Sequence, residues 1–285
     1  MTDVLTPVSS SAVYPESPRW KDGELWFSDV HDYALKKVSR DGVVERLCEV
    51  PSRPAGLGFL PDGRLLVATA KDKCLWTFDG DSLELCMDLS EMVTGLLNDM
   101  VVDGHGRAYV GDTGFNLMAG DEPAPGSILR VDVSGSGPVA SRVVATGLDF
   151  PNGMALSGDG RRLWVAETRG PRVTRFAVSP EGDLLDRETV IELPDLVDGL
   201  CADAEDGVWV AVLRPGEFWR VASDGRVTRK ISVAGQFAIA CTLGGPDRRN
   251  LYLCSAVTTM EDLARGVSSG RIHSLRVDVP GAGWP

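Results

Sequence analysis

Four residues with side-chain oxygen atoms occupy one repeated position of this 285-residue chain: Glu16, Asn98, Asn152 and Asp198. Carboxylate and amide oxygens are hard ligands, which suit Ca²⁺, Mg²⁺ or Mn²⁺. Zn²⁺ ranks lower because the set contains no His or Cys. A divalent cation held by such residues can polarise a carbonyl and lower the pKa of a bound water. The four residues therefore predict a site for one divalent cation, with Ca²⁺ as the first expectation, and hydrolytic chemistry.

A more ordinary interpretation is that these residues form turns before strands, as Asn and Asp often do. Glu16 fits this interpretation poorly, because Glu is not a typical turn residue. The occurrence of Asn or Asp at the matching position of three further copies fits it even less well. The repeat itself therefore decides between the two.

The repeat is a short apolar strand, a Gly-containing turn and a second apolar strand. We call the first residue of each copy its leading residue, and the six leading residues are Glu16, Ala55, Asn98, Asn152, Asp198 and Ala240. Successive copies start 39, 43, 54, 46 and 42 residues apart. Periods of this size with several short strands per unit are typical of β-propellers. In a propeller the leading residues lie at one height around the axis, so the four polar ones converge.

The first copy shows how one blade is built. Asp-Gly pairs at 22–23 and 41–42 each separate two apolar runs, which is a strong hairpin signal. Two hairpins give four strands, at 17–21, 24–30, 35–39 and 43–50. The interval of 54 residues leaves room for an insertion, Phe115 to Ser127, between the second and third strands of the third blade.

The last copy is one strand short. Its third strand is 271–277, and only the eight residues DVPGAGWP (278–285) follow in the sequence. We expect Asp3 to Val8 to supply the fourth strand and close the ring, so that deleting residues 1–9 abolishes folding. The prediction is an all-β, six-bladed β-propeller with four-stranded antiparallel blades, forming a single domain over residues 1–285.

Composition excludes several classes of function. The net charge of −12 and the pI near 4.8 argue against nucleic-acid or anionic-membrane partners, which require clustered Lys and Arg. The N-terminal segment lacks the features of a signal peptide, and no apolar run reaches the ~18 residues of a membrane helix. The six cysteines have no paired spacing, which predicts free thiols. We therefore expect a cytoplasmic protein.

Five segments at blade spacing resemble the senescence marker protein/gluconolactonase/luciferin-regenerating enzyme family: 16–20 (ESPRW), 97–103 (LNDMVVD), 150–154 (FPNGM), 196–200 (LVDGL) and 243–248 (LGGPDR). The resemblance covers essentially the whole chain and implies a six-bladed propeller. It implies that Glu16, Asn152 and Asp198 bind one divalent cation, and that Asn98 touches metal, water or substrate. Members are mostly lactone hydrolases, and similar phosphotriester hydrolases use a comparable centre.

The resemblance also implies roles in catalysis. The cation would polarise the lactone carbonyl and stabilise the oxyanion. Asp198 would act as general base or, alternatively, as nucleophile, and the sequence leaves both open. Asn98 would assist at the same centre. Asp99, next to Asn98, is expected to point away from the axis as a supporting or turn residue, with a role in proton transfer as the alternative.

The pocket wall departs from the sugar-lactone pattern. An Arg that grips substrate hydroxyls in such family members is replaced here by Leu96, and the insertion offers Phe115 and Met118. Unpaired hydroxyls in an apolar pocket cost ~1–3 kcal/mol each, so we predict a lactone or ester less polar than gluconolactone. His31 lies in a loop on the same face and is a further candidate contact. The loops also carry the two arginines expected to bind a substrate carboxylate, Arg169 and Arg214.

Other functions remain as alternatives. A phosphotriesterase-like hydrolase would use the same residues on a different ester. A calcium-binding propeller that serves only as an interaction module would need no catalytic carboxylate, and many propellers are interaction platforms. A synthase of the strictosidine type ranks last, because it would not need a ring of oxygen ligands. The expected partner is a small-molecule lactone or ester.

Overall fold

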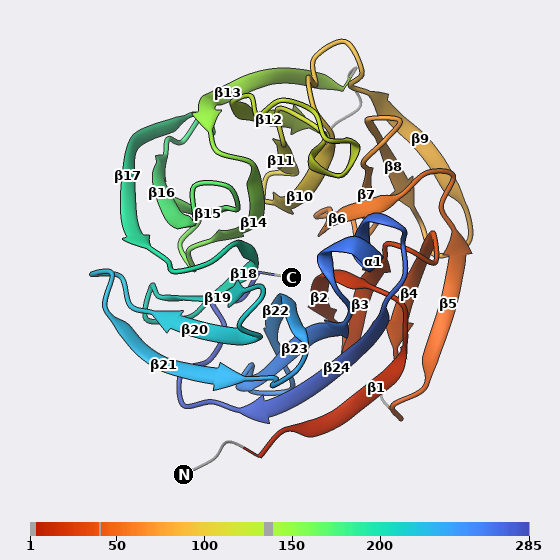
Figure 1. Ribbon diagram of the computed structural model, residues 1–285. Helices are drawn as coiled ribbons and strands as arrows, with labels where there is room; N and C mark the ends of the chain where they lie inside the picture. Colours follow the sequence, from red (N-terminus) through yellow and green to blue (C-terminus); the bar gives the residue numbers. More distant parts are fainter. Residues whose placement is uncertain (1–3, 40, 134–138, 285) are drawn as a thin grey trace.

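The computed structural model describes residues 4–39, 41–133 and 139–284. Its strands form six sheets of four antiparallel strands, which surround a central axis as blades (Figure 1). The predicted six-bladed β-propeller is therefore confirmed. In each blade the first strand lies nearest the axis and the fourth lies at the rim.

The strands of the first three blades follow the chain in order. Blade 1 contains β2 (Pro15–Lys21), β3 (Glu24–Asp29), β4 (Ala34–Val38) and β5 (Val44–Glu49). Blade 2 contains β6 (Pro54–Phe59), β7 (Leu65–Thr69), β8 (Cys74–Phe78) and β9 (Leu83–Asp88). Blade 3 contains β10 (Leu97–Val102), β11 (Arg107–Asp112), β12 (Gly126–Asp132) and β13 (Ala140–Leu148).

The remaining blades repeat this arrangement. Blade 4 contains β14 (Pro151–Leu156), β15 (Arg162–Glu167), β16 (Arg172–Val178) and β17 (Leu184–Glu192). Blade 5 contains β18 (Val197–Ala202), β19 (Val208–Val212), β20 (Glu217–Val221) and β21 (Val227–Ser232). Blade 6 contains β22 (Phe237–Gly244), β23 (Asn250–Val257), β24 (Ser269–Arg276) and, from the other end of the chain, β1 (Thr6–Ala12).

Blade 6 closes the ring as predicted, with the N-terminal strand at its rim. β1 pairs antiparallel with β24, from Thr6 opposite Ser274 to Ala12 opposite Gly270. The strand lies later than the predicted Asp3 to Val8, because the register on β24 continues to the buried Ala12. Asp3 lies outside the described residues.

The innermost strands approach each other closely at the leading residues. Every blade has a register shift between its first two strands at this point, spanning Glu16/Arg19, Pro54/Leu57, Leu97/Met100, Pro151/Met154, Val197/Leu200 and Ala238/Ala240. Such bulges bend a strand and re-aim its side chains. Glycine follows the leading residue in three blades, and a Cβ on Gly153 would lie 2.4 Å from the Leu200 nitrogen of the next blade. The bulges and the close packing together turn the leading side chains toward the axis.

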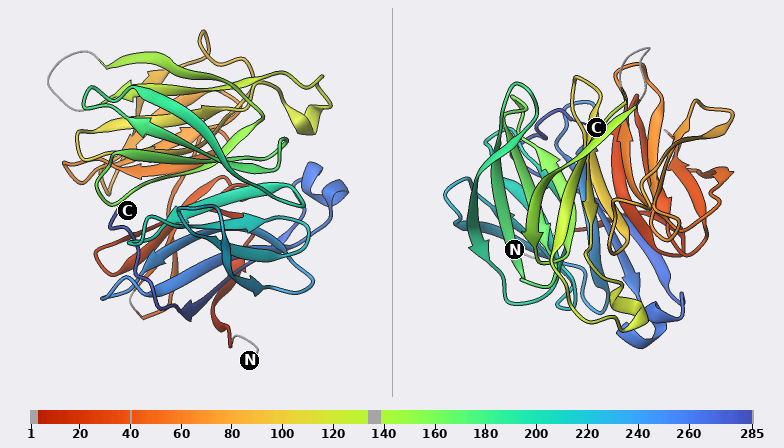
Figure 2. Two further views of the ribbon diagram at one scale, coloured as in Figure 1. Left: turned by 90° about the vertical axis from the view of Figure 1, so that its left-hand side faces the viewer. Right: turned by 90° about the horizontal axis from the view of Figure 1, so that it is seen from above.

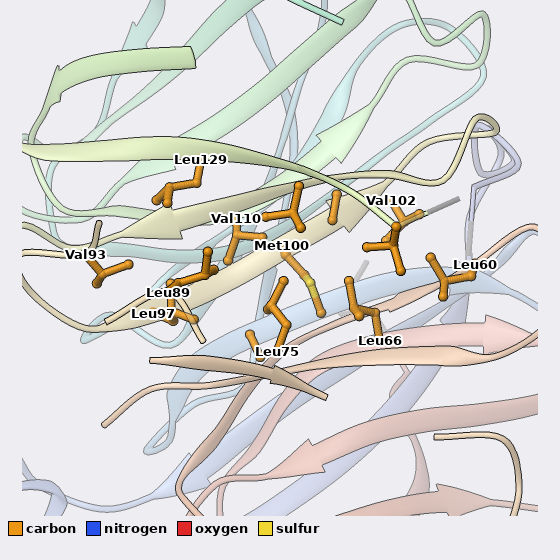
Figure 3. Packing of buried hydrophobic residues seen from close by; sticks show 14 residues of the cluster. Leu60, Leu66, Leu75, Leu89, Val93, Leu97, Met100, Val102, Val110 and Leu129 are labelled. Carbon is orange, nitrogen blue, oxygen red and sulfur yellow. The ribbon is translucent and has the colours of Figure 1, made fainter. Parts of the chain in front are cut away.

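Apolar side chains fill the space between neighbouring blades. Figure 3 shows Leu66 and Leu75 of blade 2 packed against Met100, Val110 and Leu129 of blade 3, all of them buried. Burying a side chain of this size contributes about 1.5–3 kcal/mol. Each blade thus has a partner on both faces, and this holds the inner strands at a fixed spacing.

In the described part of the chain, two short helices lie outside the blades. The predicted insertion connects β11 to β12 and contains η1 (Leu117–Ala119), while α1 (Met260–Ala264) follows β23. Both helices project from the same face of the ring (Figure 2). No helix in the described ranges is long and apolar enough to cross a bilayer. All six cysteines are free thiols, as predicted.

Deleting residues 1–9 tests the role of β1 in closing the ring. The deletion removes the pairs that Thr6, Pro7 and Ser9 make with β24, so we expect insoluble protein or a fall in melting temperature of at least about 10 °C, since one kcal/mol corresponds to roughly 2–4 °C in a domain of this size. A chain starting at Leu5, which loses the exposed Val4, is the control. Unchanged melting by circular dichroism after the longer deletion would contradict closure by β1.

Candidate functional site

The leading residues line a cavity on the axis, which we call the axial cavity. Its volume is about 130 Å³, against the roughly 10–15 Å³ that a single water needs, so it has room for a small-molecule ligand. Five leading residues border it: Glu16, Ala55, Asn98, Asn152 and Asp198. The structure therefore brings the four predicted polar residues to one place, from blades 1, 3, 4 and 5.

Hydrogen bonds orient the two amide groups. The Asn152 Nδ2 atom donates to Asp198 Oδ1 at 2.6 Å and to Thr168 Oγ1 at 3.0 Å. The Asn98 Nδ2 atom donates to the Pro151 carbonyl oxygen at 3.3 Å. With both NH₂ groups bonded to protein, each amide oxygen is left without a hydrogen bond to any described residue. Two carbonyl-type oxygens are thus available to a ligand in the cavity.

The two carboxylates lie in an unfavourable electrostatic environment. Burial raises the pKa of Glu16 well above its usual value, and the negative charges of Asp198 and Asp99 raise it further. Burial and Asp99 likewise raise the pKa of Asp198, against the hydrogen bond from Asn152. Neither carboxylate has an ion-pair partner among the described residues. A cation between them would relieve this repulsion.

The donor set suits a hard divalent cation. In the described ranges no three His, Cys, Asp or Glu side chains form a metal-binding group by themselves. A cation on the axis would therefore need the amide oxygens of Asn98 and Asn152 beside the carboxylates of Glu16 and Asp198. Two carboxylates and two amide oxygens are a combination that Ca²⁺ accepts, with water or substrate completing its shell.

Asp99 borders the axial cavity, so the expectation that it points away from the axis is wrong, whereas its contacts agree with the expected supporting role. It accepts hydrogen bonds from Ser17 Oγ and from the backbone nitrogen of Met100, and it forms a buried ion pair with Arg19 at 3.0 Å. The Arg19 guanidinium also donates to the carbonyl oxygens of Leu57 and Met100. The pair thus connects the inner strands of blades 1, 2 and 3 beneath the site.

Three of the predicted substrate contacts line the axial cavity: Leu96, Met118 and His31. His31 stacks on Tyr14 with ring centroids 5.1 Å apart, and its Nδ1 atom lies 3.3 Å from Ser268 Oγ. Burial and the neighbouring Arg53 lower the pKa of His31. This favours the neutral imidazole at the cavity mouth.

The other three predicted contacts lie outside the cavity lining. Phe115 is buried behind Phe150, which it meets edge-on with centroids 5.4 Å apart. Arg214 donates to Asp195 at 2.8 Å on the surface. Arg169 is anchored through its backbone nitrogen, which donates to the Asp149 carbonyl oxygen. Loop position alone placed these residues on the correct face without fixing the direction of their side chains.

Two residues that were not predicted from the sequence, Arg53 and Tyr14, also line the axial cavity. Each lies two positions before a leading residue, Ala55 or Glu16. Residues at this offset in three other blades also border the cavity: Leu96, Phe150 and Leu196. We call these five residues the upper ring. Its signal was available in the repeat, because the same offset recurs in every copy.

Carboxylates at the ends of second strands hold the segments that carry the upper ring. Asp29 accepts hydrogen bonds from the backbone nitrogens of Val13 and Tyr14. Asp112 binds the backbone of Thr94 and Gly95, and Glu167 binds the Asp149 nitrogen. All three carboxylates are buried. Their sequence signal is an acidic residue that ends the second strand of the copy.

The fold and this axial site together define the class of protein. Residues 14–257 match the family model described as SMP-30/Gluconolactonase/LRE-like region, and the chain belongs to this family. The resemblance found in the five sequence segments is therefore confirmed.

Named relatives and a solved structure are similar over nearly the whole chain. Pentonolactonase XacC of Haloferax volcanii is 27% identical, with 99% of this chain and 96% of the relative covered. Regucalcin of Xenopus laevis is 26% identical, with coverages of 94% and 92%. A crystal structure of a calcium-binding protein, regucalcin, from Agrobacterium tumefaciens superposes with a TM-score of 0.84 at 20% identity, over 100% of this chain and 97% of that one. This last likeness shows the fold.

The Arg19–Asp99 ion pair provides a test of how the site is supported. Arg19→Met leaves Asp99 unpaired beside two further carboxylates, so we expect the free energy of unfolding to fall by about 3–5 kcal/mol. Adding Asp99→Asn should recover part of that loss, because the uncompensated charge is gone. Urea denaturation of the two single variants and the double variant measures both effects. A loss below about 1 kcal/mol for Arg19→Met would show that the pair is not a structural support.

Proposed function

We propose that this chain is a lactone hydrolase that holds one divalent cation, Ca²⁺ first, on Glu16, Asn152 and Asp198, with Asn98 beside them. The observation that carries the proposal is the pair of carboxylates on the axis, half-buried Glu16 and buried Asp198, which have no cationic partner among the described residues and lie beside two free amide oxygens. Family membership and a relative named as a pentonolactonase support the substrate class. A relative named regucalcin supports calcium.

The cation, when bound, would polarise the substrate carbonyl and stabilise the negative charge that develops on its oxygen. The chain's own residues perform the remaining steps. Asn152 holds Asp198 through Oδ1 at 2.6 Å, which fixes the carboxylate against the cavity. Asp198 accepts a proton from the attacking water, and that proton then passes to the ring oxygen as the acyl carbon–oxygen bond breaks. Asn98 orients the attacking water, which donates a hydrogen bond to its amide oxygen.

The wall above the four polar residues favours an apolar substrate body. Three members of the upper ring are Leu96, Phe150 and Leu196, and Met118 and Leu263 cover the mouth. These side chains offer no partner to hydroxyl groups, and each unpaired hydroxyl costs about 1–3 kcal/mol. We therefore propose a lactone with a largely apolar body, which carries fewer hydroxyl groups than a sugar lactone.

Lactone hydrolysis after chelation tests the proposed activity. We expect chelated protein to be inactive and added Ca²⁺, Mg²⁺, Mn²⁺ or Zn²⁺ to restore ring opening to different degrees. Asp198→Asn should lower kcat/KM at least about 100-fold, while circular dichroism shows an intact fold. Asp195→Asn is the matched control, since this carboxylate lies three residues before Asp198, in the connection that leads into β18, but pairs with Arg214 outside the cavity. Full activity of the chelated protein would refute metal dependence.

A second prediction concerns substrate polarity. Among γ- and δ-lactones of similar ring size, we expect kcat/KM to be higher for those with alkyl or aryl substituents than for glucono-δ-lactone, by about tenfold or more for each hydroxyl left unpaired at about 1.4 kcal/mol. Initial rates followed by pH indicator would give the ranking. A preference for the polyhydroxylated lactone would contradict the apolar-wall argument.

A further inference from the structure

The upper ring contains a single formal charge. Its five members are Tyr14, Arg53, Leu96, Phe150 and Leu196, so four blades contribute an aromatic or aliphatic side chain and blade 2 contributes a guanidinium. Blade 2 also lacks a polar leading residue, because its leading residue is Ala55. Ala55 and Arg53 both border the axial cavity, and the small Ala55 side chain fills little of the space on the blade 2 side.

Among the described residues, the Arg53 side chain has no hydrogen-bond or ion-pair partner. Its Nε atom is buried and makes no hydrogen bond within the described residues, and the side chain forms no ion pair with any of them. The backbone is fixed, since the Arg53 carbonyl oxygen accepts from the Ala70 nitrogen at 2.8 Å. Burial lowers the pKa of the guanidinium, against the attraction of Tyr33 and Glu16. An unpaired guanidinium in such surroundings is costly, and an anionic ligand would remove the cost.

Positive charge continues from Arg53 to the mouth. Arg53 and His31 also border an outer cavity of about 400 Å³, together with Lys71 and Arg265. Of the described residues that line this outer cavity, none is Asp or Glu. Arg265 pairs with Glu261, whereas Lys71 has no ion-pair partner in the described part of the chain. In a chain with a net charge of −12, this local excess of positive charge would attract an anion.

We infer that the substrate is a lactone bearing a carboxylate, and that Arg53 binds this carboxylate at the blade 2 side of the axial cavity. The inference rests on the proposed lactone hydrolysis. The lactone carbonyl would lie at the four polar leading residues, and the upper ring would contact the substrate body. The planar guanidinium fork matches a carboxylate with two parallel hydrogen bonds. Binding of the substrate carboxylate, which the sequence suggested for Arg169 and Arg214, is thus assigned to Arg53 in this proposal.

A matched pair of substrates separates charge recognition from other effects. The probes are 5-oxotetrahydrofuran-2-carboxylate and its primary carboxamide, which differ in charge but hardly in shape. Arg53→Met should lower kcat/KM for the carboxylate about 10- to 100-fold and change that for the carboxamide less than about threefold. Arg53→Lys should recover part of the loss, since it restores the charge without the fork.

Arg46→Met serves as the control variant. The Arg46 guanidinium donates at 2.8 Å to Asp32, which lies in the same loop as His31. Arg46 itself borders neither the axial nor the outer cavity. Removing its charge should leave the ratio of the two kcat/KM values unchanged. If Arg53→Met instead lowers both values equally, Arg53 only balances the charge of Glu16, and the inference is overturned while the lactone hydrolase stands.

A binding measurement decides the inference even if wild-type protein opens neither lactone, which would count against the proposed function. The probe is 3-oxocyclopentanecarboxylate, a ring that cannot be hydrolysed, titrated into folded wild-type protein and Arg53→Met by calorimetry. Binding to wild type that weakens at least about tenfold in the variant supports a carboxylate subsite. Equal binding to both proteins, or no binding to wild type, overturns it.

Discussion

The close approach of six inner strands at the axis is the constraint on which the rest of this structure depends. Gly153 and Gly199 have no room for a Cβ atom, because the next blade lies within 2.4–2.5 Å of where it would be. A bulge in every blade accompanies this approach and re-aims the leading side chain. The same bulge between the first two strands, present in all six blades, therefore determines which side chains meet at the axis.

That convergence has an electrostatic consequence. Glu16, Asp99 and Asp198 come together in a partly enclosed space, and of these three only Asp99 has a cationic partner among the described residues, Arg19. Repulsion between the remaining two carboxylates lowers the stability of the fold, a cost that functional sites often carry. A cation between them would turn this repulsion into attraction. Closure of the ring by β1 keeps the blades from relaxing away from it.

The repeat explains why much of the site was predictable. Leading residues share a position relative to the turn, so their convergence followed from counting along the sequence. Arg53 was not predicted, although it lies two positions before a leading residue, as Leu96 does, and every copy has a residue at this offset. Phe115 and Arg214 belong to loops that the repeat does not constrain: one side chain lies behind Phe150, and the other pairs with Asp195. Side-chain direction in such loops depends on tertiary contacts that one sequence does not reveal.

The most direct test of the account is to locate the cation itself. Crystals of the metal-free protein soaked in Mn²⁺ give an anomalous signal wherever the ion binds. We predict one strong peak on the axis, within about 2.0–2.6 Å of oxygens from Glu16, Asn152 and Asp198, and no such peak in Glu16→Gln crystals. A peak at any other place, or none in crystals of protein that opens lactones, would contradict the central claim.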